Sequence, residues 1–122
     1  MNNQAIEQEI QKKGLTAPRV TLADIEANIA GAYYFTALNG VVGELGVEAD
    51  VFEPGELQDT LGLLTFCVLI CRNGFTVTGE SACASPENFD ADLGRKIARD
   101  NAVSKVWPLM GYELKSRLDA GA

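Results

Sequence analysis

The feature that most constrains the fold is an Asn-Gly pair that separates two strand-like runs in the second half of the chain. Residues 63–70, before Asn73-Gly74, are mostly apolar, whereas apolar residues alternate with threonines in residues 75–78 after it. Asn-Gly is the favoured pair of a two-residue type I′ hairpin, in which both central residues have positive φ. The sequence therefore predicts an antiparallel β-hairpin over residues 63–81.

The two strands of this hairpin differ in their patterns. Apolar side chains on both faces of residues 63–70 predict a central strand that is covered on both sides. The alternation in residues 75–78 predicts one buried and one wetter face for the return strand. Cys67 and Cys71 fall on the same strand face at roughly 13 Å from each other, which is too far for a disulfide. We expect reduced thiols that pack as small apolar groups.

A long helix is predicted after the hairpin. Ser85, followed by Pro-Glu, favours a helix start because serine accepts from orphan amides and the acidic side chain complements the helix dipole. Apolar residues then recur at helical spacing, beginning with Phe89, Leu93 and Ile97. Pro108 removes an amide within this pattern, so we expect a kink or a break there. We place the helix over residues 86–118 and expect residues 119–122 to fray.

Upstream of the hairpin, Thr21 and Asp24 form a capping-box pattern, and the apolar spacing after them predicts a short helix over residues 22–32. The aromatic run Tyr33-Tyr34-Phe35 fits either a last helical turn or a short strand, and both remain open. Asn39-Gly40 indicates a turn.

These elements predict one α+β domain over residues 21–118, in which the hairpin packs on the long helix and the short helix. Residues 1–20 form a helical arm before it, and residues 119–122 form a tail. The chain has no apolar run of about 18 residues, so we expect no membrane-spanning helix. Its first residues carry charges where a signal peptide needs an apolar segment, which predicts a cytoplasmic setting.

Composition excludes several classes of function. The net charge is −7, from 17 acidic and 10 basic residues, which argues against binding to a nucleic-acid backbone. The chain has no histidine, which removes the commonest general base and most zinc and iron ligand sets. We therefore expect no enzyme activity, no catalytic residue, no cofactor and no metal site.

Two segments are candidate binding sites. The acidic loop, residues 46–60, has no basic residue and carries five carboxylates, on Glu48, Asp50, Glu53, Glu56 and Asp59. It is a candidate contact for the basic surface of a partner. The helix carries Arg95, Lys96 and Arg99, which could bind phosphates while Tyr33 or Tyr34 stacks on a base. The alternatives are a solvated helix face for the basic residues and core packing for the tyrosines.

The runs LLTFCVL, NGFTVTGESAC, PENFD and GRKIA, with Tyr33-Tyr34-Phe35 upstream and Trp107 downstream, form a distinctive set of motifs. Through these motifs the chain resembles, over residues 22–118, a family of small tailed-phage proteins. The family is typified by the gene-forty-nine product of a coliphage and the gene-sixty-six product of a Shigella phage. The resemblance implies a phage or prophage origin and expression in the cytoplasm of a bacterial host. It implies no catalytic residue.

Three functions are compatible with these observations. The first is a non-enzymatic accessory protein that binds a host protein or defence complex and inhibits bacterial defence, in the manner of an anti-CRISPR or another anti-defence factor. The second is sequestration of a small nucleotide that serves as an immune signal. The third is a structural or assembly role in the phage. A homo-oligomer is compatible with all three.

Overall fold

The computed structural model describes residues 3–15, 17–48, 53, 55 and 57–121. Its elements are α1 (Asn3–Lys12), α2 (Leu22–Asn28), β1 (Ile29–Thr36), α3 (Ala37–Leu45), η2 (Leu61–Leu63), β2 (Leu64–Cys71), β3 (Thr76–Ala82), η3 (Pro86–Asn88) and α4 (Ala91–Ala120). This arrangement confirms the predicted α+β class, with the hairpin on a long C-terminal helix. No helix in the described part of the chain is long and apolar enough to span a bilayer.

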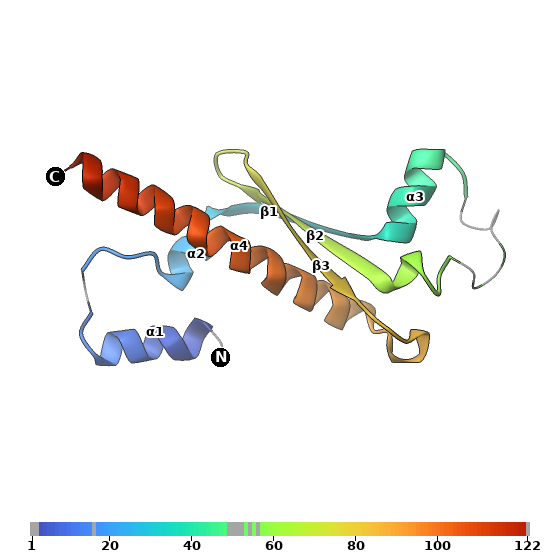
Figure 1. The fold of residues 1–122 in the computed structure, drawn as a ribbon, viewed down its shortest axis with the longest axis horizontal. Coiled ribbons are helices and arrows are strands. Elements are labelled where there is room, and N and C mark those ends of the chain that lie inside the picture. The colour runs from blue at the N-terminus through green and yellow to red at the C-terminus, as the bar shows by residue number, and fades with distance from the viewer. Residues whose placement is uncertain (1–2, 16, 49–52, 54, 56, 122) are drawn as a thin grey trace.

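Three antiparallel strands form a sheet in the order β1-β2-β3, and α4 crosses one face of it (Figure 1). Alternate residues of the central strand β2 are buried, and the residues between them are half-buried. The prediction that this strand is covered on both sides is therefore wrong. Among the described elements, α4 covers one face, whereas α3 and η2 approach the strands only at one end of the sheet.

The core lies between α4 and the sheet. Its buried side chains come from α2, β2, β3 and α4, namely Ile25, Cys67, Leu69, Cys71, Val77, Ala98, Ala102, Val103 and Val106. All three cysteines are free, and Cys67 and Cys71 are buried on the same face as predicted. The apolar stripe predicted from Phe89, Leu93 and Ile97 is not the core stripe, because Leu93 and Ile97 are exposed. Small alanines, not these larger residues, face the sheet.

The closest contact between helix and sheet is at Gly79 of β3. A Cβ atom at this position would lie 2.9 Å from Cα of Ala102 and would also collide with the carbonyl oxygen of Ala98 and the amide of Ala102. Backbone atoms of α4 therefore occupy the space that any other residue would need. Glycine at position 79 allows the helix to lie directly on the strand.

The β2–β3 turn differs in detail from the prediction. The Cys71 amide donates to the Phe75 carbonyl at 2.8 Å, and the Gly74 amide donates to the Cys71 carbonyl at 2.9 Å. Gly74 has a φ of 88°, but no described residue other than glycine has a positive φ, so Asn73 does not and the turn is not type I′. The loop has three residues and places its glycine in the left-handed position, as the second most common hairpin turn does. The Asn73 side chain accepts from the Phe75 amide at 2.9 Å.

The segment before the hairpin departs most from the prediction. The Thr21 capping box is confirmed, but α2 ends at Asn28, and Tyr33-Tyr34-Phe35 lies in strand β1. Asn39-Gly40 is not a turn but part of α3, because Thr36 and Asn39 form a second capping box. The Asn39 amide donates to Thr36 Oγ1 at 3.2 Å, and the Thr36 amide donates to Asn39 Oδ1 at 2.8 Å.

The long helix begins later than predicted and continues further. Residues Pro86–Asn88 form a short 3-10 turn, and Ser85 makes no side-chain cap. The cap of α4 is Asp90, whose carboxylate accepts from the Leu93 amide at 3.0 Å. Pro108 does not break the helix, because Val106 and Met110 pack on the core on both sides of it.

The arm helix α1 has no buried residue, and one ion pair attaches it to the segment before α2. Arg19 donates to both carboxylate oxygens of Glu7, at 2.9 and 2.6 Å. These charge-assisted hydrogen bonds to Arg19, with a further one from Gln11, lower the pKa of Glu7 from 4.5 to about 2. This ion pair therefore links the arm to the segment before α2.

We expect Gly79→Ala to destabilise the domain by about 3 kcal/mol or more, because the added methyl group meets backbone that cannot move locally. Urea unfolding at pH 7 would measure the loss. Gly111→Ala is the matched control: a Cβ there meets nothing within 4 Å, and alanine should stabilise the helix by about 0.5–1 kcal/mol. A Gly79→Ala variant within about 1 kcal/mol of the native protein would contradict the close contact.

We expect Glu7→Gln to release α1 while the domain stays folded, because it removes the charge that holds Arg19. In the native protein, acid should have the same effect. The pKa of Glu7 is lowered on folding, so its contribution is present above about pH 4.5 and is lost as the pH falls towards about 2. Backbone ¹⁵N relaxation of residues 3–12 would report the release. Glu9→Gln is the control, because Glu9 pairs with Lys13 within the arm at 3.1 Å; equal release by both variants would contradict the assignment.

Candidate functional site

The face of the sheet opposite α4 carries apolar side chains that no described helix covers along most of its length. We call this surface the open face. Cross-strand pairing places Tyr33 opposite Val68 and Phe35 opposite Phe66, with Ile70 beside them. Tyr33 is 61% exposed and Phe35 is 40% exposed. The rings of Phe35 and Phe66 lie 5.5 Å apart in a tilted arrangement, so the aromatic residues form an ordered surface.

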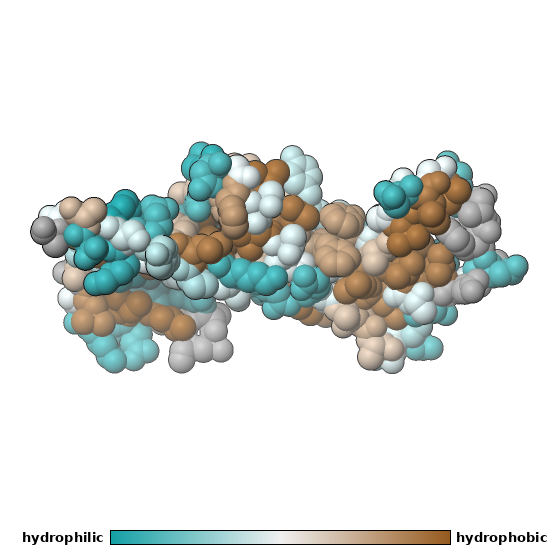
Figure 2. All heavy atoms as spheres, turned by 45° about the horizontal axis from the view of Figure 1, so that its top comes forward, coloured by the Kyte–Doolittle hydropathy of each residue, from teal (hydrophilic) through white to brown (hydrophobic). Residues whose placement is uncertain are grey.

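At the α3 end, the open face continues into an apolar groove of about 320 Å³ between helix and sheet. Phe35 and Phe66 form its sheet side, and the α3 residues Gly40, Val41, Glu44 and Leu45 form much of the rest. Leu45 is 58% exposed. Figure 2 shows hydrophobic residues gathered at this end of the molecule. A partner could therefore insert apolar side chains between α3 and the sheet.

The charged groups at this surface are acidic. The open-face positions of β1, β2 and β3 include no lysine or arginine, whereas Glu80 lies on β3 and Glu44 lines the groove. Of the predicted acidic loop, Glu48, Glu53 and Asp59 are exposed. Asp50 and Glu56 lie outside the described residues. The described loop residues are in the connection between α3 and η2, at the groove end of the sheet.

Some residues of the predicted basic site lie together on the face of the sheet that α4 covers. Arg99 Nη1 lies 3.5 Å from the Tyr34 hydroxyl, and Arg99 Nη2 lies 3.2 Å from the Glu26 carboxylate. The hydrogen bond with Tyr34 is the main cause of a raised pKa of Arg99, and the charge of Glu26 adds to it. One turn earlier on α4, Arg95 pairs with Asp92.

A small cavity of about 80 Å³ lies next to these groups. It is lined by residues from β1, α3, β2 and the start of α4, together with Phe89 just before α4, and Tyr34, Asn39 and Arg95 are among them. Three predicted contacts do not line it, and Arg99 is one of them although it bonds to Tyr34. Tyr33 points to the opposite face of the sheet because side chains alternate along a strand, and Lys96 is exposed and does not line the cavity.

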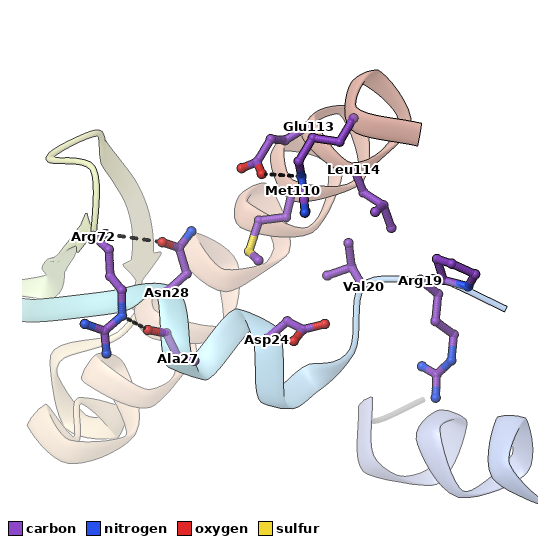
Figure 3. Close-up of a pocket in the computed structure, with 11 residues that line it drawn as sticks. Arg19, Val20, Asp24, Ala27, Asn28, Arg72, Met110, Glu113 and Leu114 are labelled. Atoms are coloured by element: carbon purple, nitrogen blue, oxygen red, sulfur yellow. Dashed lines mark hydrogen bonds and ion pairs between the residues drawn. The ribbon is translucent and has the colours of Figure 1, made fainter. Parts of the chain in front are cut away.

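A wide cleft, of about 510 Å³, lies between residues 18–28, Arg72 and the C-terminal half of α4. Figure 3 shows Met110 and Leu114 of α4 across from Val20 and Asp24, with Arg19 pointing away towards the arm. The arginines here are engaged: Arg19 with Glu7, Arg72 with the Ala27 carbonyl, and Arg117 with Glu113. The three guanidinium groups at this cleft therefore already have partners within the chain.

No cluster in the described part of the chain brings together three His, Cys, Asp or Glu side chains that could hold a metal ion. The thiol of Cys67 is fully buried, and burial raises its pKa. Its role is therefore to fill space between the sheet and α4.

Sequence reasoning missed the residues that form most of the open face and the groove, including Phe66, Val68, Ile70, Val41 and Leu45. The apolar run of β2 does not show which of its faces is covered. The signal that could have found the open face is the alternation in β1, which puts Tyr33 and Phe35 on one side and Tyr34 on the other.

A family model for the phage protein (N4 Gp49/phage Sf6 gene 66) family matches residues 20–118. The chain belongs to this family. No curated protein and no solved structure matches it. The matched residues include the whole sheet, α2, α3 and most of α4, and they begin after the arm helix.

Proposed function

We propose that this phage protein is a non-enzymatic accessory factor that binds a host protein and thereby inhibits a bacterial defence complex in the host cytoplasm. The observation that supports it is the open face, an ordered aromatic and aliphatic surface with acidic groups beside it. Large exposed apolar patches on soluble proteins commonly mark interaction sites. Aromatic side chains at the centre of such patches contribute most to binding.

The charge around the open face defines the chemistry of the partner. Glu44, Glu80 and the exposed carboxylates of the 46–60 loop would repel an acidic surface and attract a basic one. We therefore infer a host protein that presents apolar side chains next to lysines or arginines. A nucleic-acid-binding channel of a defence complex has basic residues of this kind.

The test compares capture of host proteins by the native chain and by a Tyr33→Ser/Leu45→Glu variant. Leu93→Ser is the matched control, since Leu93 is similarly exposed, at 54%, but lies on α4. A specific partner should be lost with the double variant and kept with the control.

With the purified partner, calorimetry should show binding weakened at least about tenfold by the double variant. Added salt should weaken binding of the partner to the native chain, because salt screens the charges around the open face. Partners that bind both variants equally would refute this use of the open face.

Sequestration of a nucleotide signal is the second candidate. The observation in its favour is that Tyr34 of β1 and Arg95 of α4, which are far apart in sequence, line one cavity, and that Arg99 bonds to the Tyr34 hydroxyl. Arginines bind phosphates through paired hydrogen bonds, and a tyrosine can stack on a base. Under this proposal Arg95 would exchange Asp92 for a ligand phosphate.

Calorimetry with cyclic dinucleotides and ADP-ribose derivatives would test the second candidate. Arg95→Ala should weaken binding by about tenfold or more, the usual loss for a charge-assisted hydrogen bond. Lys105→Ala is the control, because Lys105 is exposed on α4 and does not line the cavity. Absence of heat and of any thermal shift with every one of these nucleotides would exclude this candidate.

A further inference from the structure

The two edges of the sheet differ, and the difference starts from the hydrogen bonds of β2. The Cys71 amide donates to Phe75, so the backbone of Cys71 faces β3. Backbone groups alternate in direction along an antiparallel strand, so Ile70 faces β1 and bonds with its partner Gly31. Every second residue of β1 from Gly31 therefore bonds to β2. The amides and carbonyls of Ala32 and Tyr34 point to the outer edge.

Nothing in the described part of the chain occupies this edge. The hydrogen bonds near it lie at its ends, where Thr36 bonds with Asn39 and the Asn28 carbonyl accepts from Arg72. Beyond the bulge between Ile29 and Gly31, the strand lacks the other usual protections of an exposed edge, since IAGAYYFT contains no proline and no charged residue.

The edge of β3, by contrast, is protected. By the same alternation, the carbonyl of Glu80 points outward, and it accepts a hydrogen bond from the Asn101 side chain at 2.7 Å. The Glu80 side chain adds a charge, and α4 lies against the neighbouring Gly79. A strand that pairs with this sheet would therefore meet β1.

The side chains of β1 are complementary to the same strand in the opposite direction. About a two-fold axis at Tyr33, Gly31 of one copy lies opposite Phe35 of the other, and Ala32 lies opposite Tyr34. A small residue thus faces a large aromatic one at these two pairs. On the axis itself the two Tyr33 side chains lie opposite each other, on the face of the sheet where Tyr33 is exposed. An axis at Tyr34 would instead oppose two Tyr34 rings on the α4 face of the sheet, where Tyr34 is half-buried and its hydroxyl bonds to Arg99. An axis at Ala32 would bring Phe35 opposite Ile29, beyond the bulge at the start of the strand.

We propose that β1 pairs antiparallel with β1 of a second copy of this chain, about a two-fold axis at Tyr33. Ala32 and Tyr34 of the two copies exchange backbone hydrogen bonds, and the three strands of each copy join into one continuous sheet. The edge itself carries no charge, and Glu26 is paired with Arg99 nearby, so the net charge of −7 per chain lies mostly away from the contact. The inference does not depend on the proposed function.

Sedimentation equilibrium and light scattering of the native protein and two proline variants test this pairing. Ala32→Pro removes an outward amide of β1 without breaking its bonds to β2. Thr78→Pro is the matched control, since Thr78 has an outward amide on the β3 edge. We expect a native dimer, a dissociation constant at least about tenfold higher for Ala32→Pro, and an unchanged one for Thr78→Pro. A native monomer at a concentration of about 100 micromolar, or a dimer weakened only by Thr78→Pro, would overturn the proposal.

Disulfide trapping of Tyr33→Cys tests the register and does not rely on the proline variant folding. The two-fold axis places the two introduced thiols opposite each other in a non-hydrogen-bonded pair, about 4.5 Å apart at Cα, which suits a disulfide. Both introduced cysteines are tested in a chain that also carries Cys83→Ser. This removes the partly exposed native thiol, and the other two, Cys67 and Cys71, are buried. Mild oxidation should give a covalent dimer with Tyr33→Cys and little with Phe75→Cys, an exposed site in the hairpin loop. Equal or greater crosslinking at position 75 would overturn the proposed axis.

Discussion

The contact of α4 with Gly79 is the constraint on which the rest of the structure depends. Ala98 and Ala102 present only backbone and a methyl group to β3, and glycine presents no side chain at all. The helix therefore lies closer to this strand than any larger residue would allow. The residues between the two alanines are then directed to the sides, so that Arg99 reaches Tyr34 on β1 and Asn101 reaches the edge of β3. One close contact thus fixes what lies at both edges of the sheet.

This contact also explains why the two sides of the sheet are unequal. α4 is the helix that covers most of one face of the sheet. β3, the strand nearest to α4, has its outer edge protected by the side chain of Asn101. β1 lies farther from the helix contact and is reached mainly by the long side chain of Arg99 and by Ile25 and the rest of α2. With one long helix on one face, the chain has no described element left to cover the centre of the other face. Apolar side chains on that face remain half-buried or exposed.

The sequence predicts local structure well where the signal is local. The hairpin, the arm helix and the Thr21 capping box follow from short patterns whose physical cause is contained in a few residues. The turn predicted at Asn39-Gly40 is wrong because the capping box between Thr36 and Asn39 outweighs the turn preference of the pair. The helix start predicted at Ser85 is wrong because Asp90, further along the chain, caps α4. The cover of β2 could not be predicted, since an apolar strand has the same pattern whether one face or both are packed. Of the candidate site residues, Arg99 bonds to Tyr34 and Arg95 lines a cavity with Tyr34, whereas the period of two in β1 puts Tyr33 on the opposite face of the sheet.

The features that distinguish this domain converge on β1. Tyr33 and Phe35 belong to the open face, Tyr34 on the other side meets the arginines of α4, and the outer backbone groups of the strand have no partner in the described part of the chain. A strand with an exposed aromatic face and an unpaired edge is costly for a monomer, because both features favour association. β3, from the same sheet, is protected at its edge by the Asn101 hydrogen bond, the charge of Glu80 and the nearby α4. β1 has none of these, and this difference between the two edges is the physical basis of the proposed pairing at β1.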